Sequence, residues 1–443
     1  MNSQEYWRKR EAEALKHYIT EEAEYDKQIN KIYTNMLANC QKEINAFYGR
    51  YADKEGITIA EAKKRVSSMD IKAYEAKAKR YVKDKEFSQQ ANEEMRLYNA
   101  TMRINRLEML KANIGLELIA GTDDLEKFME GILKGRTEAE LKRQAGILGK
   151  TIKNNAQAVH SIVNGSFHNA TFSQRIWNNS AAMKADLDKL IQSGMIAGKN
   201  TNVLAKDLQK YFIGEPRLAN GKKGAKYRAE VLMRTELARV QTEAQKQSFI
   251  RNGFSQYQFI VNGGCCDICE EIKGKVFDVE KMMPGENAPP MHPLCRCSTA
   301  AYSDRKEYDA WLDYLEKGGT TANWEKMNKY VEKSEKGSII MPKEKFINYA
   351  LDPKKAPDKA KAFEEYLGYN LENCAELIEN IDEHINENKF VEKGDNGHGM
   401  RYEYIVNITG ANGKSANILT AWIQDGKKKR LTSVYVTKRS VTK

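Results

Sequence analysis

Residues 1–215 of this 443-residue chain contain no proline, and the first glycine is Gly49. Proline and glycine are the residues that interrupt helices most strongly, so this half of the chain can form long helices. From Trp7 to Phe47 apolar side chains recur at helical spacing, which predicts one long amphipathic helix or two with a soft break. A second run covers residues 81–119, and we expect it to end at Gly121.

Cysteine and histidine gather in one short segment of a chain that is otherwise poor in both. Five of the seven cysteines and one of the six histidines lie within residues 265–297. Pairs spaced three positions apart let a tight turn aim two side chains at one ion, and tetrahedral zinc needs four nitrogen or sulfur donors. We therefore predict a structural zinc ion in a hairpin at about residues 255–302. The candidate ligands are Cys266, Cys269, His292, Cys295 and Cys297.

Alternatives for this site stay open in the sequence. Cys295 and Cys297 compete for one ligand position, and Cys265 is the poorest candidate. Free buried cysteines or a disulfide would also explain the cluster, but we expect no signal peptide and so disfavour a disulfide. A catalytic zinc is disfavoured as well, since sites this rich in cysteine normally leave no coordination position open.

The segment before the hairpin places a carboxylate on an apolar helical face, because Glu236 falls within an apolar arc of the helical wheel. A buried carboxylate needs a partner, so we hypothesise a structural ion pair among Arg234, Glu236 and Arg296 that joins this helix to the hairpin. A catalytic role for Glu236 is the alternative. The arc consists of Ala229, Leu232, Met233, Leu237, Val240 and Ala244.

Four motifs follow one another in a set order over about residues 150–302. In that order the segment resembles the Mu F-like minor head protein, or head morphogenesis, family of tailed phages. The resemblance implies a minor capsid protein, located in the virion near the portal and in the host cytoplasm during assembly, with portal and head proteins as partners. The family is not known for enzymatic activity. The motifs are Arg234-Thr235-Glu236, Cys266-x-x-Cys269, Gly274-Lys275-Val276-Phe277 and His292-Pro293-x-Cys295-Arg296-Cys297.

The charge balance fits a chain that meets a polyanion. The formal net charge is +11, which favours non-specific contact with packaged DNA. Charged residues nevertheless make up 30% of the chain with both signs mixed, so most of them are expected on solvated helix faces. No apolar run reaches the ~18 residues that a membrane span requires.

The last third of the chain has shorter predicted helices and also predicted strands. Residues 303–342 read as two short helices and a linker, and a helix is expected over Leu371–Glu387. Three strand-like runs separated by glycine-containing turns then predict a small α+β domain with an antiparallel sheet. We thus expect a mainly α protein in four parts, with boundaries 1–120, 121–302, 303–342 and 343–443. The expected strands are Arg401–Thr409, Ser415–Gln424 and Arg430–Thr437.

The function of this last domain is less constrained. Residues 396–443 carry 9 basic and 2 acidic side chains, so the predicted sheet is a candidate surface for binding RNA. The alternative is that these charges lie on a solvated sheet face that binds no RNA. The aromatic side chains that would assist RNA binding are Tyr402, Tyr404, Trp422 and Tyr435. About residues 343–437 resemble a domain of unknown function at the C-termini of polymorphic toxins and phage proteins. The features that carry this resemblance are Lys359-Ala360, Phe363, Gly368, Gly410, Asn412-Gly413, Trp422-Ile423 and Leu431-Thr432.

An RNase-like effector carried by a head protein is therefore our alternative hypothesis for the function. Such an enzyme needs a cation for the phosphate and an acid or base group. His398, Arg401 and Thr432 are the candidates, although an exposed histidine without a function explains His398 equally simply. The resemblance itself assigns no catalytic residue.

Overall fold

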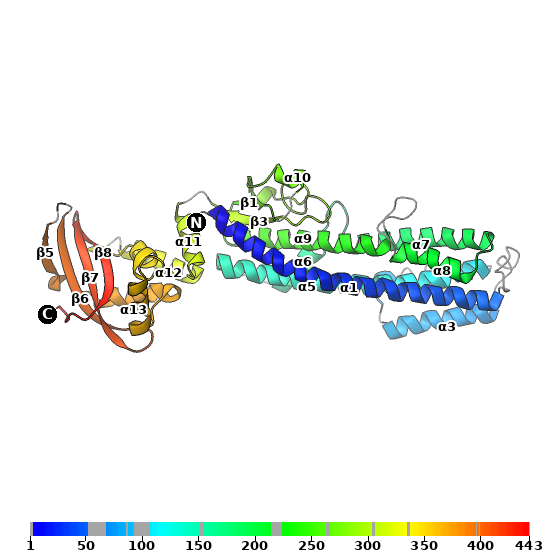
Figure 1. Ribbon diagram of the computed structural model, residues 1–443, viewed down its shortest axis with the longest axis horizontal. Helices are drawn as coiled ribbons and strands as arrows, with labels where there is room; N and C mark the ends of the chain where they lie inside the picture. The colour runs from blue at the N-terminus through cyan, green and yellow to red at the C-terminus, as the bar shows by residue number, and fades with distance from the viewer. Residues whose placement is uncertain are drawn as a thin grey trace. The chain divides into compact units, whose positions relative to one another are not determined.

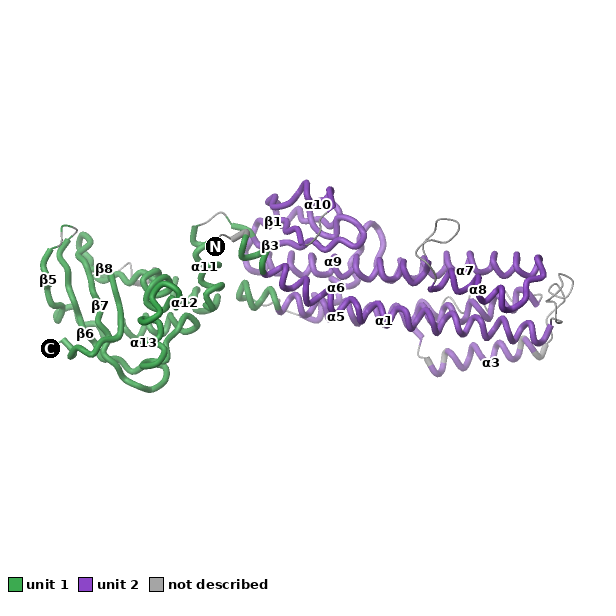
Figure 2. The backbone as a smooth tube through the Cα atoms, in the orientation of Figure 1, with its two compact units in different colours: residues 1–9, 143–151, 302–443 green, residues 10–142, 152–301 purple. Residues whose placement is uncertain are grey.

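The computed structural model describes residues 3–51, 68–85, 87–92, 106–150, 155–213, 224–262, 266–303, 306–334, 337–395, 397 and 399–442 (Figure 1). The chain folds into two compact units. One unit combines residues 10–142 with 152–301, and the other combines residues 1–9, 143–151 and 302–443 (Figure 2). None of the described helices is both long and apolar enough to cross a membrane.

Long helices that run side by side build the unit of residues 10–142 and 152–301 (Figure 1). Apolar side chains at helical spacing form the main core, which includes Ile29, Leu187 and Val240, and helix α3 packs through Tyr74 and Ala78 in a second, smaller cluster. The expected first helix is confirmed as a single element. The helices are α1 (Ser3–Tyr51), α3 (Ser68–Lys85), α5 (Arg106–Leu148), α6 (Asn155–Val163), α7 (Phe172–Ile196), α8 (Thr201–Phe212) and α9 (Ala225–Arg251).

Helix α5 corrects the expectation that a helix ends at Gly121. The helix continues through this residue to Leu148. A Cβ atom at Gly121 would collide with the side chain of Met36 on α1. The glycine therefore permits a close approach of two helices, a role that is indistinguishable from helix termination when only the sequence is considered.

A small hairpin module follows α9 in the same unit. Its three-stranded sheet has the order β2–β1–β3, with β1 and β2 antiparallel. The candidate metal ligands occupy the two connections of this sheet, and a short apolar cluster around Phe259 supports them. The elements are β1 (Gln256–Ile260), α10 (Asp267–Glu270), β2 (Val276–Asp278), η1 (Val279–Lys281) and β3 (Ser298–Tyr302).

The other unit contains a five-stranded sheet with helices packed on it. Helix α13 contacts β7 and β8, and helix α14 contacts β6. Its helical elements are α11 (Lys306–Glu316), α12 (Thr321–Ser334), η2 (Phe346–Ala350), α13 (Pro357–Leu367), η3 (Leu371–Asn373), α14 (Cys374–His384) and η4 (Glu387–Lys389). Its strands are β4 (Ile339–Ile340), β5 (Val391–Asp395), β6 (Met400–Thr409), β7 (Ser415–Asp425) and β8 (Lys428–Thr437).

The sheet order β4–β8–β7–β6–β5 corrects the expectation of a purely antiparallel sheet. The three expected strands are confirmed as β6, β7 and β8 and pair antiparallel through two hairpins. Strand β4 pairs parallel with β8, so the sheet is mixed. This strand was missed because it consists of only Ile339 and Ile340 within a segment that we expected to be a linker.

The two short helices before the sheet belong to the same compact unit as the sheet. The Tyr314 hydroxyl on α11 donates a hydrogen bond to the Leu371 carbonyl over 2.5 Å. The buried Lys343 ammonium lies 3.8 Å from the ring centre of Trp324 on α12. Helices α11 and α12 are therefore packed onto the α+β fold.

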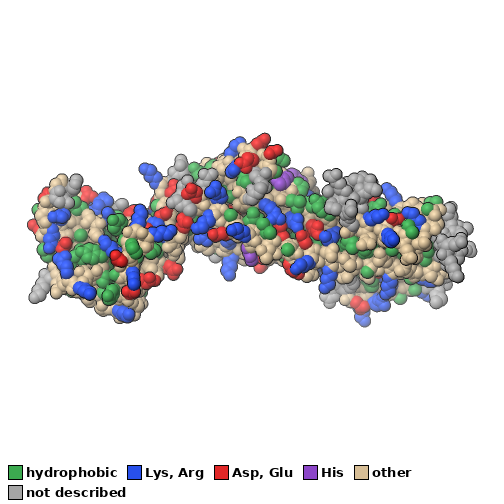
Figure 3. All heavy atoms as spheres, in the orientation of Figure 1, with side chains coloured by type: hydrophobic (Ala, Val, Ile, Leu, Met, Phe, Trp, Pro, Cys, Tyr) green, Lys and Arg blue, Asp and Glu red, His purple; other side chains and the backbone are tan. Residues whose placement is uncertain are grey.

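Charged side chains of both signs are interspersed on the face that Figure 3 displays. Many of them pair along one helix, as Lys226 does with Glu230 over 2.8 Å. This arrangement agrees with the expected solvated helix faces.

Candidate metal centre

The cysteine cluster comes together in space as its spacing predicts. Cys266, Cys269 and His292 form one group whose possible ligand atoms all lie within 4.8 Å of one another. Cys269, Cys295 and Cys297 form a second such group, so Cys269 belongs to both. These clusters can hold a metal ion. Cys265 lies outside the described residues.

The local backbone geometry positions the sulfur atoms of the first two cysteines close to His292. Cys266 directly precedes the short helix α10, and its carbonyl accepts the Cys269 amide over 3.1 Å. The sulfur atoms of Cys266 and Cys269 lie 3.1 and 3.5 Å from Nε2 of His292. The Pro293 carbonyl, 2.8 Å from Nδ1, can only accept a hydrogen bond, so Nδ1 carries the proton and Nε2 offers a lone pair to the cluster.

The separations fit a tetrahedral ion. Zinc with bonds of about 2.3 Å to sulfur and about 2.0 Å to nitrogen places its ligand atoms about 3.5 to 3.8 Å apart. The Cys269–His292 separation of 3.5 Å and the Cys269–Cys295 separation of 3.9 Å lie close to these values. The separation between Cys266 and His292 is shorter than the tetrahedral value, at 3.1 Å.

The thiols of this cluster differ in their readiness to ionise. The hydrogen bond between Cys295 and Cys297 lowers the pKa of the Cys295 thiol and raises the pKa of the Cys297 thiol. Burial raises the pKa of Cys269. Since metals bind thiolates, Cys295 is the cysteine of this group that is most ready to bind an ion.

The three residues of the Arg234-Thr235-Glu236 motif face three different neighbours. Arg234 forms ion pairs with Glu22 and Asp26 of α1. The Thr235 hydroxyl accepts a hydrogen bond from the Leu294 amide of the hairpin over 3.3 Å. Glu236 is fully buried and accepts a hydrogen bond from Arg239 over 2.6 Å.

The ion pair that we expected among Arg234, Glu236 and Arg296 therefore has a different composition. Arg234 and Arg296 do not meet Glu236; both reach Glu22 on α1, at 3.5 and 2.7 Å. Glu236 instead pairs with Arg239, which also donates to the carbonyls of Ile162 and Val163 at the end of α6. Sequence reasoning missed Glu22 because 274 positions separate it from Arg296.

A second set of buried polar contacts joins the hairpin to the helices. Gln245 of α9 donates to the Ser298 hydroxyl over 3.0 Å and accepts from the Thr299 hydroxyl over 2.7 Å. Ser298 in turn donates to Glu11 of α1 over 2.6 Å. The last strand of the hairpin is thus bonded to two helices at the point where the metal-binding segment ends.

The described catalytic candidates of the C-terminal domain, Arg401 and Thr432, do not come together in one site. His398 lies outside the described residues. The Arg401 side chain donates to the backbone carbonyls of Lys393 and Gly394, and Thr432 donates to the Ala421 carbonyl. Arg401 and Thr432 lie on β6 and β8, on opposite sides of β7, and two strand spacings amount to about 10 Å.

Two of the four aromatic side chains expected on the RNA surface are buried, and the other two, Tyr402 and Tyr435, are half-buried. Trp422 and Tyr404 are 1% and 5% exposed. Both lie against the ring of Phe390, with a centroid distance of 5.4 Å for Trp422. They are core residues, because alternation along β6 and β7 turns them toward the packed side of the sheet.

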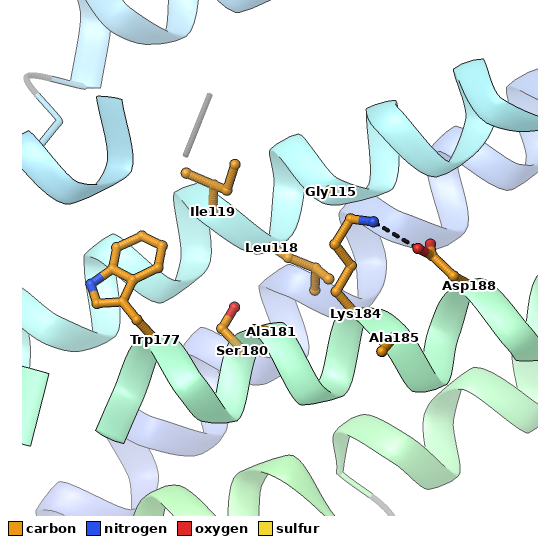
Figure 4. Close-up of a pocket in the computed structure, with 9 residues that line it drawn as sticks. All are labelled: Gly115, Leu118, Ile119, Trp177, Ser180, Ala181, Lys184, Ala185 and Asp188. Atoms are coloured by element: carbon orange, nitrogen blue, oxygen red, sulfur yellow. Dashed lines mark hydrogen bonds and ion pairs between the residues drawn. The ribbon is translucent and has the colours of Figure 1, made fainter. Parts of the chain in front are cut away.

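A cavity of about 220 Å³ lies between α5 and α7 (Figure 4). Small residues line much of it, and its polar side chains already have partners. Lys184 pairs with Asp188 over 2.7 Å, and the Ser180 hydroxyl bonds with that of Thr122. Trp177 at its edge donates to Glu126 over 2.9 Å. We assign no chemistry to this cavity.

Comparison with known families gives two matches. Residues 185–300 match the family described as Phage Mu protein F like protein. This match suggests a phage head morphogenesis protein. Residues 332–438 match the family described as Domain of unknown function (DUF6883). Neither the comparison with curated proteins nor the comparison with solved structures finds a match.

The head-protein match begins within α7 and ends within β3, so it spans α8, α9 and the whole metal-binding hairpin. The match therefore covers the residues that form both candidate ligand groups. The C-terminal match carries no assigned function, and the likeness of that domain to toxin modules stays a prediction.

Proposed function

We propose that this chain is a structural protein of a phage or prophage head, in which a zinc ion fixes the hairpin of residues 255–302 onto a helical bundle. The main observation in support of this proposal is that the head-family match covers the candidate metal centre. Arg234 and Thr235 contact other elements directly, and Glu236 holds Arg239, which bonds to the end of α6; these contacts support a structural role for this part. The predicted location is the virion.

Zinc is the proposed ion because thiolates and a neutral imidazole are its preferred ligands. Cys266, Cys269, His292 and Cys295 are the proposed ligands. Cys297 then lies outside the first coordination shell, as a hydrogen-bond partner of Cys295. A closed set of four protein ligands supports folding of the hairpin, whose long loops have little apolar material of their own.

The proposed partner is another head protein, and the portal is our specific candidate. The apolar side of α1 belongs to the core, so this helix cannot act as a free docking arm. Its opposite side exposes lysines, including Lys31 and Lys42, along a helix of 49 residues. We propose that this lysine-bearing side of α1 meets an acidic surface of the portal.

The test is incorporation into particles. A phage producing the Lys31→Glu, Lys42→Glu double variant should assemble heads that contain much less of this protein, as measured by quantitative mass spectrometry of purified particles. Lys189→Glu, an exposed charge reversal on α7, is the matched control and should be incorporated normally. Normal incorporation of the double variant would refute the α1 surface, whereas absence of the wild-type protein from heads would refute the head function itself.

A further inference from the structure

Lys359 occupies an unusual position in the C-terminal unit. Its ammonium group donates a hydrogen bond to the Ser433 hydroxyl over 3.2 Å. The same nitrogen lies 5.5 Å from the ring centre of Tyr349 and 5.1 Å from that of Tyr435. The cluster therefore joins η2, α13 and β8, with a cation between two aromatic rings.

This lysine lacks a counterion among the described residues. Its ammonium has no carboxylate within the 4.0 Å of an ion pair, and burial lowers the pKa of Lys359. Lys361, two positions further along α13, is exposed and pairs with Glu365 at 3.6 Å. A partly desolvated cation without an anion costs free energy, and a bound anion would offset that cost.

The surrounding groups indicate which anion fits. The Ser433 hydroxyl accepts from the ammonium and can itself donate to an anion, and Tyr435, whose ring centre lies 5.1 Å from the ammonium, carries a second hydroxyl donor. Tyr349 is 57% exposed, and its ring centre lies 5.5 Å from the ammonium. An exposed aromatic ring is a surface on which a nucleobase stacks.

We propose that Lys359, Ser433 and Tyr435 bind a phosphate group and that Tyr349 stacks on the attached base. The ligand is a nucleotide, either free or as part of single-stranded nucleic acid. This site is independent of the head function proposed above. It shares Tyr435 of β8 with the RNA surface considered in the sequence, but its cation is Lys359 of α13 and its stacking ring is Tyr349 of η2.

A purely structural role for Lys359 is the competing explanation, since a cation between two rings also ties α13 to the sheet. The two explanations differ in what removal of the charge does. Lys359→Met keeps most of the aliphatic stem and removes only the ammonium. A binding site loses affinity in this variant while the melting temperature stays nearly unchanged, whereas a structural clamp loses stability and no affinity.

The test is calorimetric titration of the full-length protein with uridine monophosphate, inorganic phosphate, uridine and a single-stranded oligouridylate. We expect the two nucleotide ligands to bind more tightly than phosphate, and uridine not to bind. Lys359→Met should weaken nucleotide binding at least about tenfold, because it removes a charge-assisted contact. Lys361→Met is the matched control and should bind as the wild type does.

Further measurements separate the parts of the proposal. Tighter binding of the oligouridylate than of the monophosphate would identify nucleic acid as the source of the phosphate, and the reverse order would identify a free nucleotide. Tyr349→Ala should weaken binding of uridine monophosphate but not of inorganic phosphate. Phosphate should also protect Lys359, but not Lys361, from an amine-reactive reagent followed by peptide mass spectrometry.

The proposal is overturned if wild-type protein binds none of the phosphate ligands. It is equally overturned if Lys359→Met binds them with unchanged affinity. Equal losses of nucleotide and phosphate binding in Tyr349→Ala, or no loss of either, would remove the base from the proposal and exclude a nucleotide as the specific ligand.

Discussion

Cys269 lies at the centre of the cysteine cluster, because its sulfur atom belongs to both groups of possible ligands. Its side chain is 1% exposed and packs with Phe259. An ion at this position would therefore be shielded from water on the side of the hairpin core. The hydrogen bond between its neighbours Cys295 and Cys297 lowers the pKa of Cys295 and raises the pKa of Cys297.

We predict that Cys269→Ser and Cys295→Ser lower the zinc content from about one ion per chain to near zero, because each variant removes a ligand. Cys297→Ser should keep the ion, since its hydroxyl can still donate to the Cys295 thiolate. Elemental analysis of the purified proteins measures this directly. Zinc loss in Cys297→Ser with retention in Cys295→Ser would reverse our ligand assignment, and zinc-free wild-type protein would refute the site.

Asp352 is a buried carboxylate whose charge is held by several donors. It accepts hydrogen bonds from the Lys354 and Lys355 amides and pairs with Lys317 at 3.0 Å. Burial by itself raises the pKa of Asp352, but the Lys317 side chain and the two amides outweigh it, so the pKa lies below the ordinary value. The ionised form therefore stabilises the fold.

We predict that Asp352→Asn lowers the free energy of unfolding at pH 7 by about 2 kcal/mol. A depressed folded-state pKa contributes stability that is fully present above the unfolded-state value of about 3.9 and is lost as the pH falls further. The difference between wild type and variant should therefore shrink below about pH 4. Urea denaturation at a series of pH values measures it, with the exposed Glu364→Gln as control; a difference independent of pH would contradict the assignment.

At the scale of elements, α9 is the helix that organises the head-family segment. Its residues contact α1, the end of α6 and the hairpin through Arg234, Arg239 and Thr235 respectively. Glu22 of α1 completes this arrangement because one carboxylate serves Arg234 of α9 and Arg296 of the hairpin. Three elements thus share one partly buried charge cluster.

We predict that Glu22→Gln destabilises the protein by about 1.5 kcal/mol, because two partly buried arginines lose their shared anion. Glu24→Gln is the matched control on the same helix. Glu24 is exposed and pairs locally with Lys27 and Gln28, so its loss should leave the free energy of unfolding nearly unchanged. Equal effects of the two substitutions in urea denaturation would show that Glu22 is an ordinary surface charge.

At the scale of the whole molecule, the net charge of +11 is spread among acidic and basic side chains. On the displayed face the two signs are interspersed, and many of the charges are paired within helices (Figure 3). Such a distribution attracts polyanions weakly and provides no pattern of donors for reading base sequence.

We predict that the protein binds duplex DNA weakly and without sequence preference. Because binding releases counterions, the affinity should fall at least about tenfold when the salt concentration rises from 50 mM to 200 mM. Fluorescence anisotropy with two unrelated duplexes of equal length measures both properties. Sequence-selective binding that persists at high salt would contradict this expectation.

Local patterns in the sequence predicted most of the helices, the hairpins and the candidate metal ligands. Helical periodicity sufficed for α1, and the close spacing within each half of the cysteine cluster marked Cys266, Cys269, His292 and Cys295 as candidates. The strands β6 to β8 followed from alternation and from their glycine-containing turns. The resemblance to head proteins rested on the same local motifs.

Tertiary structure alone decided how distant residues meet. The sequence gives no sign that Glu22 is shared by two arginines more than 200 positions away, or that Gly121 serves a helix contact with Met36. It likewise placed Trp422 on a binding surface, although packing against Phe390 buries it. The environment of Lys359 arises from residues of three elements. Pairings of this kind depend on the packing of whole elements, which spacing along the chain does not encode.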